Sequence, residues 1–121
     1  MLINLSNHPS EKWSQQQLDA AKCYGTVVDL PFPVIDPMAE SFEIDKLSAG
    51  YLNQIDLIFA NDIKDQQAVH IMGELTFSFS LVNKLRAKGI ACLASTTQRI
   101  VNEEDNLKMT EFQFCRFRNY K

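Results

Sequence analysis

One stretch decides the fold of this chain: AVHIMGELT, residues 68–76. Residues 68–72 form an apolar run without the polar alternation of a half-exposed strand, which is typical of a strand covered by helices in a parallel sheet. Gly73 and Glu74 end this run, and an amphipathic segment follows at once. Ligands of such sheets bind outside the carboxyl ends of the strands, so we expect Gly73, Glu74 and Thr76 to lie at that edge.

Further short apolar runs predict strands over 2–5, 26–30 and 90–94. Together with 68–72 they give a strand–helix order that repeats three times. Residues 31–37 contain three prolines and are expected to form an extended loop over the same sheet edge, and 64–67 are expected to form a polar link.

Three segments have the i, i+3, i+4 apolar spacing of helices. The first is expected to begin with Ser10 as its N-cap and to end at Gly25, and the second to run from Ser41 to near Asn61 or Asp62. The third is stopped by Gly89, and its expected apolar stripe consists of Leu75, Phe79, Val82 and Leu85.

The last part of the chain changes character. Residues 99–102 and 109–118 are expected to form two strands joined by a polar connection at 103–106. Alternation along the last strand places Phe112 and Phe114 on one face, and Cys115 and Phe117 on the other. The predicted fold class is α/β: one Rossmann-like domain over 1–121, a mostly parallel sheet flanked by three helices, and a C-terminal β-hairpin.

Composition excludes several classes of protein. With 121 residues, of which 45% are hydrophobic and 22% charged, the chain has the make-up of one globular domain. A net charge of −3 disfavours capture of duplex nucleic acid, which depends on many Lys and Arg contacts to phosphates. No run approaches the roughly 20 apolar residues of a membrane span, and residues 1–5 lack the features of a signal peptide. Three cysteines without a C-x-x-C pair predict reduced, mostly buried thiols in a cytoplasmic protein.

Familiar cofactor motifs are missing from the sequence. The four glycines are scattered, so there is neither a G-x-G-x-x-G fingerprint nor a P-loop. His8 and His70 stand far apart, and no acidic cluster has metal-ligand spacing. We therefore expect no cofactor and no metal site.

Small polar residues follow the expected strands at their carboxyl ends. Asn7 and His8 come directly after the first strand and offer an amide and an imidazole. Gly73 lets backbone approach a ligand closely, and Thr76 with the amides that open the third helix can donate to an anion.

The third expected contribution to this edge is the segment 95–99. Thr96 and Thr97 supply hydroxyl groups, and Arg99 supplies a planar fork that suits a phosphate. The three segments together are the parts of an anion-binding edge.

Each candidate also has a purely structural interpretation. His8 precedes Pro9 and fits a turn, as do the threonine hydroxyls. Glu74 either complements the dipole of the third helix or holds a ribose hydroxyl or Arg99, because its charge repels phosphate. Other residues also have structural interpretations. His70 is expected to be a hydrogen-bonded core residue, and Trp13 and Phe32 are either packing residues or platforms on which adenine stacks. Arg116 and Arg118 form either a solvated edge of the last strand or a second contact to phosphate.

The order and spacing of short motifs over nearly the whole chain carry a family resemblance. The motifs are Asn7-His8, Gln17, Asp19-Ala20, Leu30-Pro31, Gly73-Glu74, Ser95-Thr96-Thr97 with Arg99, and Arg116-Phe117-Arg118 within the segment from Phe114 to Tyr120. The chain resembles the small CRISPR-associated ring nucleases of type III systems, of the Csx type, whose Rossmann-like fold is related to cyclic-oligonucleotide sensor domains. Where this chain has Glu74, the family's pattern has aspartate, so the role of Glu74 is open.

The resemblance implies that the protein binds a cyclic oligoadenylate across a homodimer and cleaves it without a metal, which switches off type III CRISPR signalling in antiviral defence. In such cleavage a ribose 2′-hydroxyl attacks its adjacent phosphate and leaves a 2′,3′-cyclic phosphate. His8 is then the expected proton shuttle, and Arg99 and Thr96 the expected groups that stabilise the phosphorane, aided by Thr97. The expected ligand-binding residues are Asn7, Gly73, Glu74, Thr76 and Thr97.

Two other functions stay open at this point. One is a sponge that binds the same messenger without cutting it. The other is a small interaction domain that binds no nucleotide and whose polar edge is only solvated loop.

Overall fold

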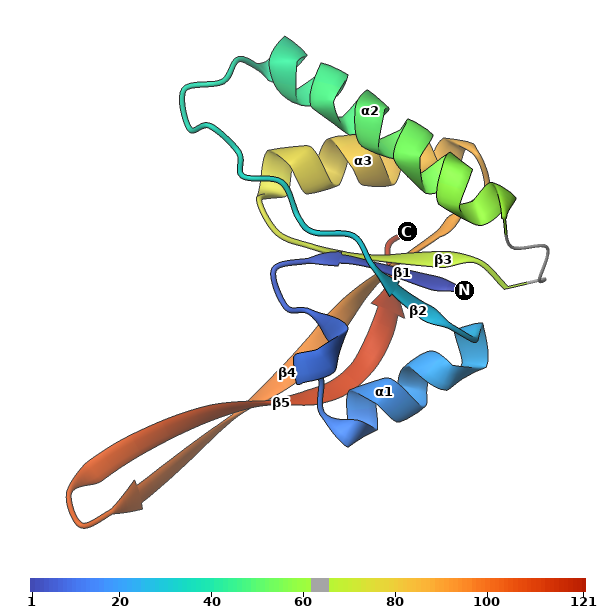
Figure 1. Ribbon diagram of the computed structural model, residues 1–121. Coiled ribbons are helices and arrows are strands. Elements are labelled where there is room, and N and C mark those ends of the chain that lie inside the picture. Colours follow the sequence, from blue (N-terminus) through green and yellow to red (C-terminus); the bar gives the residue numbers. More distant parts are fainter. Residues whose placement is uncertain (62–65) are drawn as a thin grey trace.

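The computed structural model describes residues 1–61 and 66–121. The elements, in chain order, are β1 (Leu2–Ser6), a 3₁₀ turn (Ser10–Lys12), α1 (Gln15–Ala21), a second 3₁₀ turn (Lys22–Tyr24), β2 (Val27–Asp29), α2 (Ser41–Ala60), β3 (Ala68–Met72), α3 (Leu75–Ala87), β4 (Ala91–Glu104) and β5 (Leu107–Asn119). Within the described residues this is a mixed α/β architecture, as the sequence predicts (Figure 1).

The strands of the described residues form one sheet in the order β2-β1-β3-β4-β5. β2, β1, β3 and β4 are parallel, and β5 runs antiparallel to β4. In the register, Ser6 lies beside Met72 and His70 lies beside Leu93. The carboxyl ends of β1 and β3 therefore reach the same level at one edge of the sheet.

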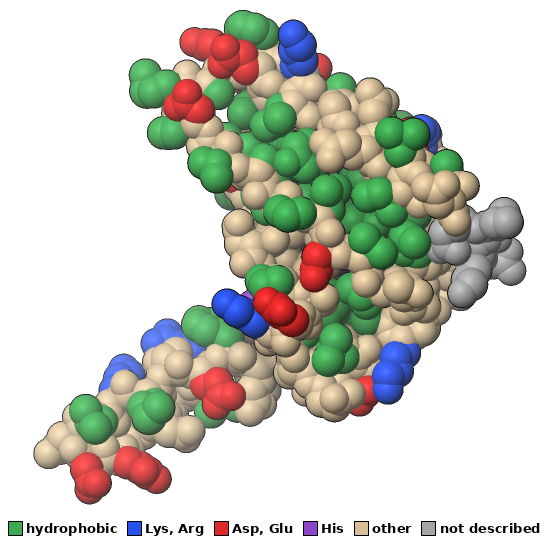
Figure 2. All heavy atoms as spheres, in the orientation of Figure 1, with side chains coloured by type: hydrophobic (Ala, Val, Ile, Leu, Met, Phe, Trp, Pro, Cys, Tyr) green, Lys and Arg blue, Asp and Glu red, His purple; other side chains and the backbone are tan. Residues whose placement is uncertain are grey.

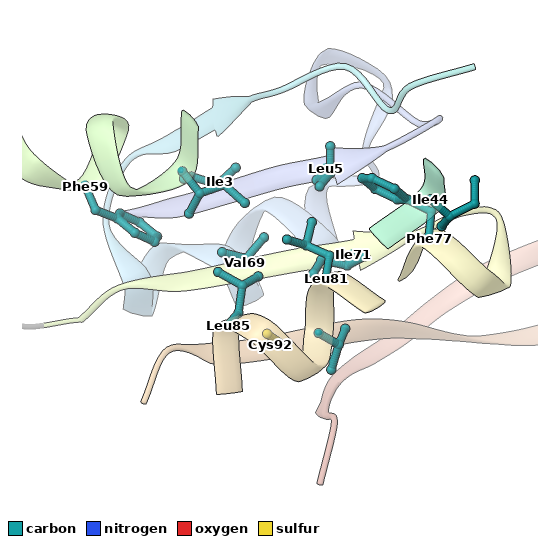
Figure 3. Packing of buried hydrophobic residues seen from close by; sticks show 12 residues of the cluster. Ile3, Leu5, Ile44, Phe59, Val69, Ile71, Phe77, Leu81, Leu85 and Cys92 are labelled. Atoms are coloured by element: carbon teal, nitrogen blue, oxygen red, sulfur yellow. The ribbon is translucent and has the colours of Figure 1, made fainter. Parts of the chain in front are cut away.

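Helices cover both faces of this sheet. α2 and α3 lie on one face and α1 lies on the other (Figure 1). On the α2/α3 face, Ile3, Val69 and Ile71 point with Phe77 and Leu81 into one apolar layer (Figure 3). On the α1 face a smaller cluster contains Leu2, Trp13, Ala21, Ala68 and Leu93. Burial on both faces explains why β3 has no polar alternation.

The first helix begins later than the sequence predicts. Its N-cap is Ser14, whose side chain accepts a hydrogen bond from the backbone N–H of Gln17, so the assignment of Ser10 as the cap is wrong. The backbone N–H and the hydroxyl of Ser10 donate instead to the carboxylate of Asp29, at 3.1 and 2.8 Å. Ser10 therefore binds Asp29 on β2 and does not cap the helix.

The second helix has a capping box formed by Glu40 and Glu43, so its N-cap is the residue before Ser41. Its last residue is Ala60, with Asn61 as the C-cap. The alternative end at Asp62, and residues 64 and 65 of the polar link expected over 64–67, lie outside the described residues.

The largest departure from prediction is in β4. The two strands expected over 90–94 and 99–102 are one continuous strand that includes residues 95–98, because β4 pairs with β5 along its length. The hairpin closes at Asp105 and Asn106, both with positive φ, as in a two-residue turn. The expected connection at 103–106 is therefore shorter than predicted.

An irregularity in the β4–β5 register between Thr96 and Thr97 changes which residues share a face of β5. The rings of Phe114 and Phe117 are 5.1 Å apart, so the prediction that they lie on opposite faces is wrong. Simple alternation fails here because the bulge adds one residue to β5. Beyond the bulge, residues 97–114 leave the body as a two-stranded ribbon, which we call the arm (Figure 1).

Two remaining expectations concern membranes and thiols. None of the helices in the described part of the chain has the length and hydropathy needed to cross a membrane. Cys92 is buried and burial raises its pKa to about 11, whereas Cys23 and Cys115 are exposed, so the thiols are free but not mostly buried.

Candidate functional site

The strand order changes direction between β1 and β3. The chain passes from β1 to β2 on one side of the sheet and then crosses back over β1 to β3 and β4 on the other. In doubly wound sheets, ligands bind in the crevice outside the carboxyl ends of the strands at such a point. We call residues 6–9 and 72–76, which follow or end these two strands, the switch-point edge.

A buried polar network supports the first half of this edge. Asn4, on β1, donates to the carboxylate of Asp29 at 2.8 Å and to the carbonyl oxygen of His8 at 3.0 Å. The side-chain oxygen of Asn4, Oδ1, accepts from the hydroxyl of Ser6 at 2.8 Å and contacts Nδ1 of His70 at 2.9 Å. Both polar groups of the Asn4 side chain are therefore used to join β1, β2, β3 and the loop after β1.

The loop that carries His8 is fixed through its backbone. The carbonyl oxygen of His8 accepts from Asn4, from the hydroxyl of Ser6 at 3.1 Å and from the indole N–H of Trp13 at 3.0 Å. The imidazole itself is exposed. His8 thus combines an anchored backbone with a side chain free to meet a ligand.

His70 is buried, with 2% of its surface exposed. The oxygen of Asn4 can only accept, so Nδ1 of His70 carries the proton of their hydrogen bond. Nε2 has no partner among residues 1–61 and 66–121, and the ring lies between those of Trp13 and Phe117, each 5.5 Å away. Burial, followed by the charge of His8, lowers the pKa of His70 to about 4, so it is neutral near pH 7. The prediction of a hydrogen-bonded core histidine is confirmed.

In the second half of the edge, residues 72–76, the hydrogen-bond donors of Thr76 are already used by a side chain of the same segment. The carboxylate of Glu74 accepts the backbone N–H of Thr76 at 2.6 Å and that of Phe77 at 3.2 Å, and it also accepts the hydroxyl of Thr76. These hydrogen bonds, with the Thr76 hydroxyl the largest contribution, hold the pKa of Glu74 below its ordinary value. The amides expected to receive an external anion therefore already hold Glu74, which caps α3.

Gly73 has a packing role at this edge. A Cβ atom on Gly73 would lie 2.3 Å from the ring of Phe32. The ring of Phe32 in turn packs on Phe77 with their centroids 5.2 Å apart. The close approach permitted by this glycine is thus made by the loop after β2, and Phe32 is a packing residue.

The third expected segment joins the edge only at its start. The hydroxyl of Thr96 accepts the backbone N–H of Arg116 at 3.2 Å and donates to the carbonyl oxygen of Arg116 at 3.1 Å, so it is engaged at the bulge. Thr97 and Arg99 are exposed on the arm. Because Leu93 is level with His70, Arg99 lies roughly 13 Å along the strand beyond the end of β3. Ser6 and Met72 lie side by side, so Asn7-His8 and Gly73-Glu74 both follow strands that end at the same edge, whereas Arg99 lies outside that group.

Sequence reasoning missed an open groove between α2, α3 and the loop at 35–39. It has a volume of about 1160 Å³, with Ile35, Leu75, Phe79 and Lys84 among its lining residues. Leu75 and Phe79 are 83% and 70% exposed, so two residues of the expected core stripe of α3 line this groove instead. The i, i+4 spacing places these two residues on a different face of α3 from the buried Phe77 and Leu81, but the two pairs have the same spacing, so the sequence does not tell which pair is buried.

Among the residues that the structure describes, no group of three or more His, Cys, Asp and Glu side chains is placed to hold a metal ion. The residues of the switch-point edge include the amide of Asn7, the imidazole of His8, the carboxylate of Glu74 and the hydroxyl of Thr76.

The fold and the edge define an α/β protein with a switch-point site. The chain belongs to the family described as the uncharacterized protein MJ1673 family, whose model matches residues 1–118. No curated protein and no solved structure matches the chain.

Proposed function

We propose that this protein binds a cyclic oligoadenylate at the switch-point edge and cleaves it as a metal-independent ring nuclease that ends type III CRISPR signalling. The observation that carries the proposal is the strand order, because the loop with Asn7 and His8 and the segment with Gly73 and Glu74 follow neighbouring strands whose carboxyl ends share the edge where doubly wound sheets bind ligands. The resemblance in the order of the motifs supplies the substrate class.

His8 is the proposed proton shuttle. In the proposed step the 2′-oxygen of a ribose attacks the adjacent phosphorus, the bond to the 5′-oxygen breaks, and a 2′,3′-cyclic phosphate and a 5′-hydroxyl result. The proton lost by the 2′-hydroxyl has to reach the 5′-oxygen. The backbone of His8 is anchored by hydrogen bonds and its side chain is exposed, which suits that transfer.

The other proposed roles follow the geometry of each residue. Asn7 lies beside His8 and is exposed, so it is a proposed contact to the ring. Arg99 is the proposed cation for the phosphorane and would reach the phosphate from the arm. Thr96 is engaged by the backbone of β5, so its proposed part is to shape the base of the arm rather than to contact the phosphate.

A homodimer is part of the proposal. A cyclic oligoadenylate has repeated, equivalent nucleotides around its ring. Two copies of one edge, related by a two-fold axis, would present the same groups to opposite sides of such a ring.

The test uses radiolabelled cyclic tetra- and hexa-adenylate, excess protein and EDTA. Linear product supports the proposal, whereas ring that stays intact and bound supports the sponge. Absence of binding to either ring removes both and favours an interaction domain. For that third function, nucleotides should leave the melting temperature unchanged, since a ligand at 100 times its dissociation constant adds roughly 2.7 kcal/mol of stability.

Two variants test the named residues under single-turnover conditions. His8→Ala and Arg99→Ala are each expected to slow cleavage by about 100-fold or more, the scale of a proton-transfer or charge-stabilising group. Arg86→Ala removes an exposed arginine from the last turn of α3 and is the matched control, with an unchanged rate. Wild-type rates in both His8 and Arg99 variants would show that the roles are assigned to the wrong residues.

A further inference from the structure

The arm lacks a covering layer. From 98 to 113 its side chains are exposed except for the half-buried Ile100, and Val101, Met109 and Phe112 are 43%, 71% and 66% exposed. An isolated two-stranded ribbon is marginally stable in water, and exposed apolar groups on it favour association. Figure 2 shows apolar and charged side chains along the arm, where it projects from the body. The arm thus presents exposed apolar side chains that a partner could cover.

The register defines the two faces of the arm. Directly paired residues share a face, and alternate pairs along the ribbon lie on the same side. One face, which we call the arginine face, therefore carries the pairs Arg99/Phe112, Val101/Thr110 and Glu103/Lys108.

The arginine face is complementary to itself. A two-fold axis through the Val101/Thr110 pair exchanges position 99 with 103 and position 112 with 108. Arg99 would then oppose Glu103 of a second copy, and Phe112 would oppose the apolar stem of Lys108 of that copy. An interface between identical chains requires this kind of relation, in which residue i meets j and j meets i.

The opposite face does not have this property. It carries Gln98/Gln113, Ile100/Glu111, Asn102/Met109 and Glu104/Leu107. The same operation places Ile100 against Asn102 and Met109 against Glu111, so apolar groups meet polar or charged ones and no opposite charges meet. Charge complementarity therefore selects the arginine face.

We propose that two copies of this chain associate through their arms, which pack antiparallel with their arginine faces together about an axis at Val101 and Thr110. The partner that covers the arginine face is thus the same face of a second copy of the chain. This association does not depend on nucleotide binding, so it can stand or fall separately from the proposed nuclease activity. It is also distinct from the two-fold arrangement proposed around the ring, because an axis at Val101 lies roughly 20 Å along the strand beyond the end of β3.

The test measures the mass of the full-length protein in solution by light scattering, without nucleotide. The wild type is expected to be a dimer at tens of micromolar. Arg99→Glu and Glu103→Arg are each expected to weaken the dimer by about tenfold or more, because like charges then meet twice across the axis. The double variant with both changes restores opposite charges and is expected to dimerise again.

Glu104→Arg is the matched control, since it makes the same change of charge on the other face of the same strand. Circular dichroism checks that each variant is folded, and the exposure of the altered side chains makes folding independent of them. A monomeric wild type, equal effects of Glu103→Arg and Glu104→Arg, or failure of the double variant to restore the dimer would each overturn the proposal. Loss of cleavage in a protein that still dimerises would instead count against the nuclease alone.

Discussion

Acidification is expected to destabilise the fold through His70. In the unfolded chain this imidazole has its ordinary pKa of 6.5, and in the folded protein its pKa is about 4. Between these values the unfolded state binds more protons, so stability falls as the pH is lowered through this window. Lowering the pH from about 7.5 to about 4.5 is expected to remove about 2.5 kcal/mol of unfolding free energy through this one group.

Urea unfolding at several pH values measures this loss. Trp13 is the only tryptophan and its ring is 5.5 Å from that of His70, so fluorescence reports on this cluster and circular dichroism on the whole fold. His70→Gln cannot titrate in this range while its amide can still donate to Asn4, so it isolates the effect of His70. The variant should lose most of the slope between about pH 4.5 and pH 6.5. An equal slope in both proteins would refute the assignment of a buried, neutral His70.

Three substitutions test other parts of the structure. Gly73→Ala is expected to destabilise the fold by about 1–3 kcal/mol, because its Cβ would overlap the ring of Phe32; combining it with Phe32→Ala should recover part of this loss, and strict additivity in urea unfolding would contradict the contact. Tyr120→Phe removes the 2.7 Å hydrogen bond from its hydroxyl to the carbonyl oxygen of Ile71 and should cost about 1 kcal/mol in the same assay. His8→Ala should change the unfolding free energy by less than about 0.5 kcal/mol, because the imidazole is exposed; a large loss would show that His8 has a structural role instead.

The elements that follow from local pattern were predictable. β3 has the predicted bounds because burial on both faces leaves an uninterrupted apolar run. The loop after β2 was likewise evident from its prolines. Alternation of strands and helices was enough to predict the mostly parallel sheet.

The elements that depend on partners far away in the sequence were not predictable. The cap at Ser10 was wrong because Asp29 binds that residue from another strand. Residues 95–98 were not recognised as part of one strand, because that strand is completed by β5, which follows later in the chain. Leu75 and Phe79 have helical spacing, but nothing in that spacing says which face α2 covers.

The candidate site was predictable in place but not in detail. The polar segments after β1 and β3 start at the same edge, since the strands are neighbours in register. The sequence left open whether Glu74 caps its own helix, and the structure shows that it does. The sequence also did not show how far Arg99 lies from the end of β3 along the strand.

Hydrogen–deuterium exchange with saturating cyclic tetra- or hexa-adenylate tests the central claim most directly, because it locates the ligand whether or not the ring is cut. Slower exchange in peptides that contain residues 6–9 and 72–76 is the predicted result. Because Glu74 and Thr76 also line the groove between α2 and α3, protection of 72–76 and of the groove without protection of 6–9 would contradict a ligand site at the switch-point edge, as would no change with either ring.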